Sequence, residues 1–252
     1  MRSRVLIITT ILSLFIHIGF AQQNDSTFIN DKTGTNPLDV SSFIELGNEY
    51  NRAFDNPQQH GDQLYLKYGN HFKKLRLNLN VKAPYQFASR PESGSVSGFG
   101  NIVLAANYVP YLTAKNGLLL TGEFNFTNGD ENFNTKRNDL TLGAGYVCYP
   151  WRKSVITTYY KQAFTVSNRG TNDNINEGII GILFTVKSEN QRQWLSLNPV
   201  VTWDYVNSKD VFTGKVEAGK LFTHSISLAI RPGIVWGDSD RWLLAVLLRK
   251  VF

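Results

Sequence analysis

Few residues in this 252-residue chain are placed for acid–base or nucleophilic chemistry. Beyond the first 21 residues the histidines are His60, His71 and His224, and a serine nucleophile needs a base within hydrogen-bond reach. His224 directly precedes Ser225, and adjacent residues of a strand point to opposite faces. The sequence therefore predicts no catalytic residue and no enzymatic activity.

Metal chemistry has no better support in the sequence. Cys148 is the only cysteine, which excludes an internal disulfide and a cysteine cluster. The acidic residues Asp130, Glu131, Asp173 and Glu177 fall in expected loops, where their spacing matches no calcium-binding loop. We expect neither a metal site nor a cofactor.

A larger set of polar residues alternates with apolar ones. Between residues 75 and 83 every second residue is apolar, and the polar set includes the cations Arg76 and Lys82. Successive side chains of a strand point to opposite faces, so this pattern predicts a strand with one apolar and one polar face. If such strands close into a barrel with the polar face inside, the candidate lumen residues are Arg76, Asn78, Asn80, Lys82, Glu123, Asn125, Thr202, Asp204, Lys215, Glu217, Arg231 and Arg249.

The start of the chain resembles a secretory signal. Arg2 and Arg4 precede the apolar stretch 5–20, and small residues at Gly19 and Ala21 suit cleavage after Ala21. We expect residues 1–21 to be a signal peptide, with a retained anchor helix as the alternative. Cleavage removes two cations and no acidic residue, which takes the formal charge from +6 to +4.

Composition restricts the destination of the exported chain. No later segment is apolar enough for a spanning helix, and the mean hydropathy of -0.22 is too polar for a helical membrane protein. A closed β-barrel is the other structure in which every backbone N–H and C=O group is hydrogen-bonded within lipid. The cations stand singly along the expected strands and form no basic cluster, so we expect no nucleic-acid partner.

The rest of the chain divides into strand-length segments. Most of the segments are about ten to fifteen residues long, which matches tilted membrane strands better than the shorter strands of soluble sheets. We therefore predict an all-β fold, an antiparallel transmembrane β-barrel of 10–12 strands over residues 61–252. The segments are 62–69, 73–84, 98–112, 117–127, 139–149, 153–167, 176–187, 193–206, 211–222, 225–236 and 241–252.

The connections between these segments alternate in length. If the last strand ends in the periplasm, the turns at 113–116, 150–152, 188–192 and 223–224 are periplasmic, and all are short. The connections on the other side are longer and polar. This asymmetry is typical of outer-membrane barrels. The long external connections are 85–97, 128–138 and 168–175.

The polar segment 22–60 leaves two interpretations open. Ser42 and Glu45 have the spacing of a helix capping box, and apolar residues follow at helical spacing, which predicts a short helix. That reading merges 62–84 into one strand and gives ten strands, with the helix as a plug or cap. In the alternative, which we favour, 42–52 is the first of twelve strands.

Three short motifs carry a family resemblance. Gly98-Phe99-Gly100-Asn101-Ile102, Asn198-Pro199 and Arg231-Pro232-Gly233-Ile234 resemble outer-membrane barrels of the family named for the meta-pathway of phenol degradation. The resemblance spans roughly residues 60–252 and implies a transporter or channel for small hydrophobic or aromatic compounds. The family usually has an acidic residue where Asn101 stands, so the role of that carboxylate does not carry over.

The last residue completes this picture. Phe252 resembles the terminal aromatic residue that the barrel assembly machinery reads, although Lys250 stands at a commonly apolar position. We expect an outer-membrane conduit for a small hydrophobic or aromatic compound, with outer-membrane lipid, lipopolysaccharide and the assembly machinery as partners. The alternative is a non-transporting structural or surface-binding barrel. Charges that pair across the lumen would seal it, unless loops and plug leave a narrow path.

Overall fold

The computed structural model describes residues 38, 41–56, 58–90, 94–133, 136–151, 153–170, 174–237 and 240–252. The expected signal peptide, residues 1–21, lies outside the described residues, and so does all of 22–40 except Leu38. Within the described ranges, no helix is long and apolar enough to cross a membrane.

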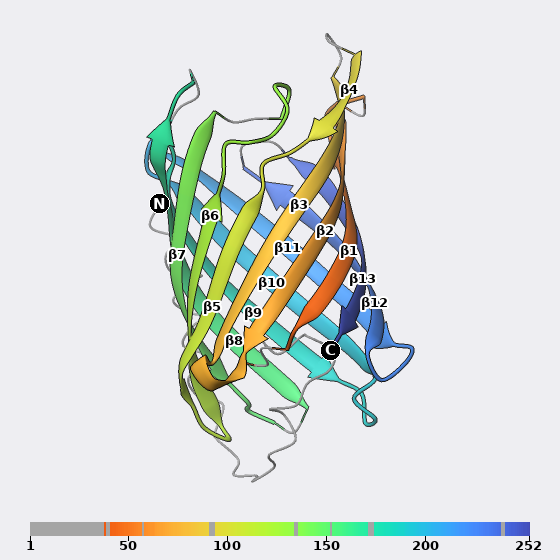
Figure 1. Ribbon diagram of the computed structural model, residues 1–252. Helices are drawn as coiled ribbons and strands as arrows, with labels where there is room; N and C mark the ends of the chain where they lie inside the picture. Colours follow the sequence, from red (N-terminus) through yellow and green to blue (C-terminus); the bar gives the residue numbers. More distant parts are fainter. Residues whose placement is uncertain are drawn as a thin grey trace, which may run out of the picture.

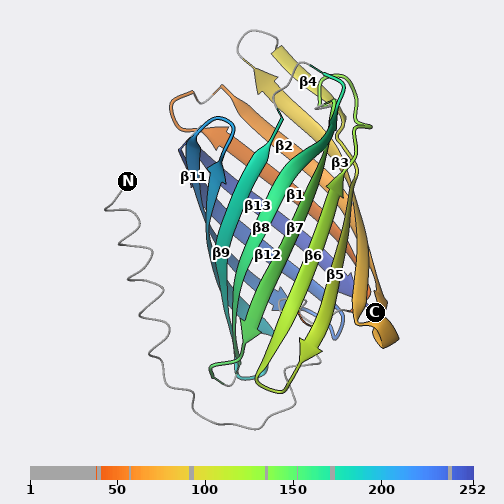
Figure 2. The same ribbon diagram turned by 90° about the vertical axis from the view of Figure 1, so that its left-hand side faces the viewer.

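The described chain forms one tube of tilted antiparallel strands (Figures 1 and 2). The strands are β1 (Phe43–Ala53), β2 (His60–Phe72), β3 (Leu77–Arg90), β4 (Gly94–Phe99), β5 (Val103–Leu112), β6 (Asn116–Asn125), β7 (Arg137–Cys148), β8 (Ser154–Asn168), β9 (Asn176–Lys187), β10 (Gln193–Asp204), β11 (Lys209–Leu221), β12 (Ile226–Trp236) and β13 (Arg241–Val251). A single 3-10 turn, η2 (Lys73–Leu75), connects β2 to β3.

The sheet closes on itself as a ring of twelve. Strands that follow one another in the chain pair, and the first strand β1 pairs with the last strand β13. Strand β4 is not an extra member of the ring, because β4 and β5 pair with successive stretches of β3, residues 85–90 and 77–82. The prediction of a twelve-stranded antiparallel barrel is confirmed.

The two ends of the tube differ. The C-terminus and η2 lie at one end, and β4 projects from the other (Figure 1). Turns at the first end are short, whereas residues 126–136 and 169–175 form longer connections at the second end. We name the first end periplasmic and the second external, following the asymmetry of outer-membrane barrels.

The segment 85–97, expected as an external loop, is largely strand. Strand β3 continues to Arg90, and β4 returns antiparallel to it from Gly94, whose φ of +72° suits a glycine. Gln86 and Ala88 keep the alternation by which every second residue of β3 faces inward. Strands β3 and β4 therefore form a regular hairpin that projects beyond the ring.

The segment around Ser42 and Glu45 is strand β1 and not a helix. The helical spacing of its apolar residues is overridden because β1 pairs along its length with both β2 and β13. The barrel therefore begins at Phe43, earlier than the boundary predicted at residue 61.

The two faces of the wall have inverted polarity. Leu79 is 43% exposed on the outer face, whereas its neighbours Asn78 and Asn80 are buried on the inner face. In β13, Leu244 and Leu248 are exposed on the outer face in the same way. Apolar residues outside and polar residues inside are the pattern of a barrel that is solvated by lipid.

Candidate functional site: the barrel lumen

The structure places the predicted lumen residues on one face of the ring, with one exception. Cross-strand partners share a face, so the registers carry the inward face from Asn80 to Ala105 and Glu123, and so on around the ring. The inward-facing members of the predicted set are Asn78, Asn80, Lys82, Glu123, Asn125, Thr202, Asp204, Lys215, Glu217, Arg231 and Arg249.

Arg76 is the exception. It follows η2 with a φ of +50° and is exposed at the periplasmic end. A left-handed residue interrupts extended backbone, so the alternation that starts at Leu75 becomes a strand only at Leu77. Arg76 therefore lies outside β3 and does not share the inward face of Asn78, Asn80 and Lys82.

A first charged cluster joins β1, β2 and β13. The Glu45 carboxylate is 4% exposed and accepts hydrogen bonds from Arg249 Nε at 2.7 Å and from the Tyr65 hydroxyl at 2.9 Å. The Tyr65 ring lies over Gly47, where an added Cβ would collide with it. The absence of a side chain at Gly47 thus lets the aromatic ring lie flat against the wall.

A second cluster repeats this arrangement on β10, β11 and β12. The Glu217 carboxylate accepts hydrogen bonds from Trp194 Nε1 at 2.8 Å and from Arg231 Nε at 2.8 Å. The Trp194 ring lies over Gly219, where an added Cβ would collide with it. Each carboxylate therefore has one guanidinium and one aromatic donor, and charge-assisted bonds of this kind are the stronger ones.

Both ion pairs join neighbouring strands. Glu45 and Arg249 are direct register partners on β1 and β13, and Glu217 and Arg231 lie on the adjacent strands β11 and β12. The pairs therefore run along the wall and do not cross the lumen. They fix the charged side chains against the wall and leave the centre unbridged at these points.

Other inward side chains are held in the same manner. Lys82 Nζ lies 4.1 Å from the centre of the Tyr65 ring and 3.7 Å from a Glu49 oxygen. The Tyr159 hydroxyl reaches past β9 to donate to Asn198 Oδ1 at 3.1 Å, because Gly181 leaves room for its ring. The sequence analysis missed Glu45, Glu49, Tyr65 and Trp194. Period-two alternation within β10 would have found Trp194, because it shares a face with Thr202 and Asp204.

Three adjoining hollows follow the lumen inward from the external end. The outermost, about 340 Å³, and the second, about 150 Å³, share Asn51 and Gln63. The third, about 210 Å³, shares Lys215 and Arg231 with the second and reaches Arg249. The three hollows therefore adjoin one another from the external mouth to the level of both ion pairs.

The external loop between β6 and β7 is fixed at this mouth. Asp130 Oδ2 accepts from the Phe99 N–H at 2.7 Å, and the Asp130 N–H donates to the Phe99 carbonyl at 2.8 Å. Phe133 of the same loop lines the outermost hollow. Asp130, weighed above as a metal ligand, thus anchors the loop that borders the mouth.

The other acidic loop residues do not gather around a common point. Glu177 lies on the inward face of β9 opposite Asp204, Glu131 is exposed, and Asp173 lies outside the described residues. Among the residues that the structure describes, no group of three or more His, Cys, Asp or Glu side chains is arranged to hold a metal ion.

At the periplasmic end of the lumen, Leu38 packs against the inner wall. Leu38 is 4% exposed and packs in an apolar cluster with inward residues of β5, β6, β7 and β8. Ser41, three residues later, accepts a hydrogen bond from Asn78 Nδ2 of β3 at 3.4 Å. Leu38 and Ser41 therefore contact different parts of the inner wall, Leu38 at β5–β8 and Ser41 at β3. The inward residues around Leu38 are Val109, Leu119, Val147 and Val155.

The comparisons with known proteins agree with this geometry. No family model and no curated protein matches the chain. Among solved structures, the COG4313 outer membrane channel from Pseudomonas putida F1 matches with a TM-score of 0.66 at 16% identity, over 84% of this chain and 96% of that chain. The fold is that of an outer-membrane β-barrel.

Two further structures of this class match. The NanC porin matches with a TM-score of 0.63 at 8% identity, over 83% of this chain and 99% of that chain. The CymD monoaromatic hydrocarbon channel matches with a TM-score of 0.50 at 9% identity, over 93% of this chain and 94% of that chain. At these identities the likeness establishes the fold, and function must be argued from the lumen.

The ion pairs predict a measurable contribution to stability. Glu217→Gln removes the countercharge of Arg231, and we expect it to lower the free energy of unfolding by about 1.5–3 kcal/mol, the range for a hydrogen bond to a charged group. Urea titration in lipid vesicles measures this change. Glu123→Gln is the matched control, because Glu123 faces the lumen without an ion pair among the described contacts. Equal effects of the two substitutions would contradict a structural role for the Glu217 cluster.

Proposed function

We propose that this protein is a passive conduit of the outer membrane for a small solute. The observation that carries the proposal is the row of three adjoining hollows along the lumen, which share polar lining residues from the external mouth to Arg231. Its placement in the outer membrane is supported by the lipid-facing outer wall and by the secretory signal expected at residues 1–21.

The substrate class that we propose is a small aromatic compound, preferably one that carries a negative charge. The family resemblance of the sequence supports an aromatic or hydrophobic substrate, and one of the matching structures, CymD, is a monoaromatic hydrocarbon channel. The charge preference rests on Lys215, which lines two of the hollows and makes no ion pair among the described contacts. A cation beside the path attracts anions and repels other cations.

The chemistry of the wall agrees with a solute that is both aromatic and polar. Aromatic rings of Tyr65, Tyr159 and Trp194 lie against the inner face, while the hollows themselves border charged and amide side chains. A wholly apolar solute would meet no continuous apolar surface along this path. We therefore expect benzoate to pass more readily than a neutral hydrocarbon of equal size.

Planar-bilayer recordings on the purified protein test this proposal. We expect a small conductance whose reversal potential in a salt gradient shows anion preference, and block or permeation by benzoate. Lys215→Gln should reduce the anion preference, while Lys220→Gln on the outer face of β11 should leave it unchanged. Conductance without anion preference would refute the charged-substrate proposal alone.

The alternative function is a non-transporting structural or surface-binding barrel. The observation that favours it is the anchored loop at the external mouth, which presents residues 126–133 to the outside. It predicts no conductance for the wild type or for variants that clear the periplasmic end. Such a result would overturn the conduit proposal.

The remaining partners follow from the membrane placement. We propose that the barrel assembly machinery reads Phe252, which is 69% exposed beyond the end of β13 while its backbone N–H donates to the Ser42 carbonyl at 2.9 Å. Outer-membrane lipid and lipopolysaccharide would surround the apolar outer face. Removal of Phe252 should slow the appearance of folded barrel in pulse-chase experiments.

A further inference from the structure

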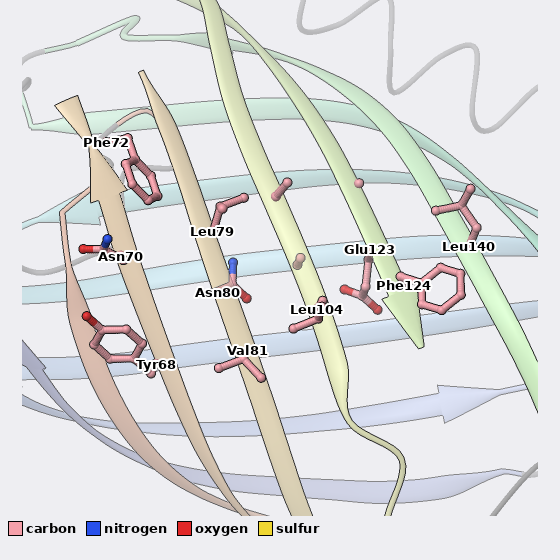
Figure 3. A pocket seen from close by; sticks show the side chains of 13 residues that line it. Tyr68, Asn70, Phe72, Leu79, Asn80, Val81, Leu104, Glu123, Phe124 and Leu140 are labelled. Carbon is pink, nitrogen blue, oxygen red and sulfur yellow. The ribbon is translucent and has the colours of Figure 1, made fainter. Parts of the chain in front are cut away.

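The lipid-facing surface has a hollow over β2, β3, β5, β6 and β7, with a volume of about 540 Å³ (Figure 3). Its floor lies where Ala106 and Gly122 are direct cross-strand partners. Gly122 contributes no side chain, and the nearest atom to an added Cβ would be Leu142 Cδ2 at 3.7 Å. Larger side chains border this floor, among them Phe72, Leu79, Leu104, Phe124 and Leu140.

Cations stand at the periplasmic end of this hollow. Phe72, which lines it, is followed directly by Lys73 and Lys74 in η2, and Lys115 lies in the neighbouring turn between β5 and β6. All three lysines are exposed, and none makes an ion pair among the described contacts. The sequence segments 70–79 and 104–120, which contain both turns, have no acidic residue.

The other periplasmic turns differ in this respect. Lys153, between β7 and β8, pairs with Glu189 in the turn between β9 and β10. The turn between β11 and β12 contains no lysine or arginine at residues 222–225. The two turns beside the hollow therefore hold three lysines and no acidic residue, whereas Lys153 and the exposed Arg192 lie in turns that the Lys153–Glu189 ion pair joins.

Aromatic residues mark the depth at which these cations lie. Tyr108 and Tyr111 are exposed on the outer face of β5, between the floor of the hollow at Ala106 and the turn that holds Lys115. Tyrosines of membrane proteins gather at the level of the lipid headgroups. The lysines thus lie at headgroup depth and the hollow at the depth of acyl chains.

We propose that this surface binds one anionic phospholipid of the periplasmic leaflet, with an acyl chain in the hollow and the phosphate beside Lys73, Lys74 and Lys115. An acyl chain matches an apolar depression that faces hydrocarbon, and basic side chains next to such a depression attract anionic headgroups. The site lies outside the lumen, so it does not depend on the conduit proposal. It depends on the orientation of the barrel, with its short turns in the periplasm.

Native mass spectrometry on the full mature chain in detergent tests the proposal, with dioleoyl phosphatidylglycerol as the probe. We expect one tightly held lipid per barrel. The triple change Lys73→Gln, Lys74→Gln and Lys115→Gln should weaken its binding by about tenfold or more, since each cation near an anionic surface contributes about 1 kcal/mol. Gly122→Leu should weaken it as well, because leucine would fill the floor of the hollow.

Matched controls lie on the outer face of β11, away from the hollow. Lys220→Gln removes a cation and Ala218→Leu adds a leucine side chain there, as the test variants do beside the hollow. Neither change should affect the binding of phosphatidylglycerol. Dioleoylglycerol, which lacks the phosphate, should bind weakly to the wild type and should not respond to the lysine changes. Heat-modifiable migration on gels shows that each variant is folded.

Three results would overturn the proposal. Equal loss of phosphatidylglycerol in the control variants would indicate charge-driven adsorption anywhere on the barrel. Equal affinity for dioleoylglycerol would remove the role of the lysines. A dimer mass that Gly122→Leu abolishes would show that a second copy of the chain occupies the hollow in place of lipid.

Discussion

Leu38→Asp is expected to raise the single-channel conductance severalfold. Leu38 is buried among apolar side chains of β5 to β8 at the periplasmic end of the lumen, and no cation belongs to that cluster. A carboxylate without a partner is costly to bury, so the segment before β1 should leave the cluster and clear the opening. Planar-bilayer recordings of the mature protein measure the change directly.

Leu38→Met is the control for this experiment. A methionine of similar volume should keep the contacts and the low conductance, because volume-conserving apolar exchanges in a packed site are well tolerated. Unchanged conductance in folded Leu38→Asp would show that Leu38 does not narrow the path. Because β1 begins at Phe43, the substitution lies outside the ring and should leave its strand pairing intact.

The second large effect concerns the lipid-facing wall. Leu142 lies near the middle of β7 and is 50% exposed on the outer face, so Leu142→Arg would place a charge at the depth of the hydrocarbon core. The cost for arginine near the bilayer midplane is about 2–4 kcal/mol. We expect the free energy of unfolding in lipid vesicles to fall by that amount in urea titrations.

The adjacent residue provides a matched comparison. Thr141 faces the lumen as the direct register partner of Glu123, so Thr141→Arg gives the new cation a carboxylate neighbour. It should cost much less than Leu142→Arg. Damage that is greater at Thr141 than at Leu142 would mean that the two faces of the wall are assigned the wrong way round.

The class of fold follows from the sequence alone, because side-chain alternation in strands is a local property. Leu77, Leu79 and Val81 lie on one face and Asn78, Asn80 and Lys82 on the other, as the period of two requires. Strand lengths and the alternation of short and long connections are local properties too, because turn residues in the sequence mark where each strand ends. The barrel, its inverted polarity and most inward-facing positions therefore follow from the sequence.

Local pattern failed where distant partners or turns control the backbone. The spacing from Ser42 to Glu45 suits a helix cap, yet in the structure Ser42 Oγ bonds Asn70 and Glu45 bonds Arg249, which is 204 residues away. No local signal identifies such a partner. At Arg76, alternation continued through a tight turn, because residue type does not reveal a left-handed φ.

The candidate site itself is a product of closure of the ring. Alternation predicts that Lys215, Glu217 and Arg231 face inward, but only strand register decides that Glu217 pairs along the wall with Arg231 and Trp194 and does not cross the lumen. Register also places Gly47 beneath Tyr65, and closure of the ring brings the inward residues of β5 to β8 against Leu38. These contacts join residues far apart in the chain. Alternation along each strand therefore predicts which side chains face inward, but only the closed ring shows how those side chains pair and how much space they leave.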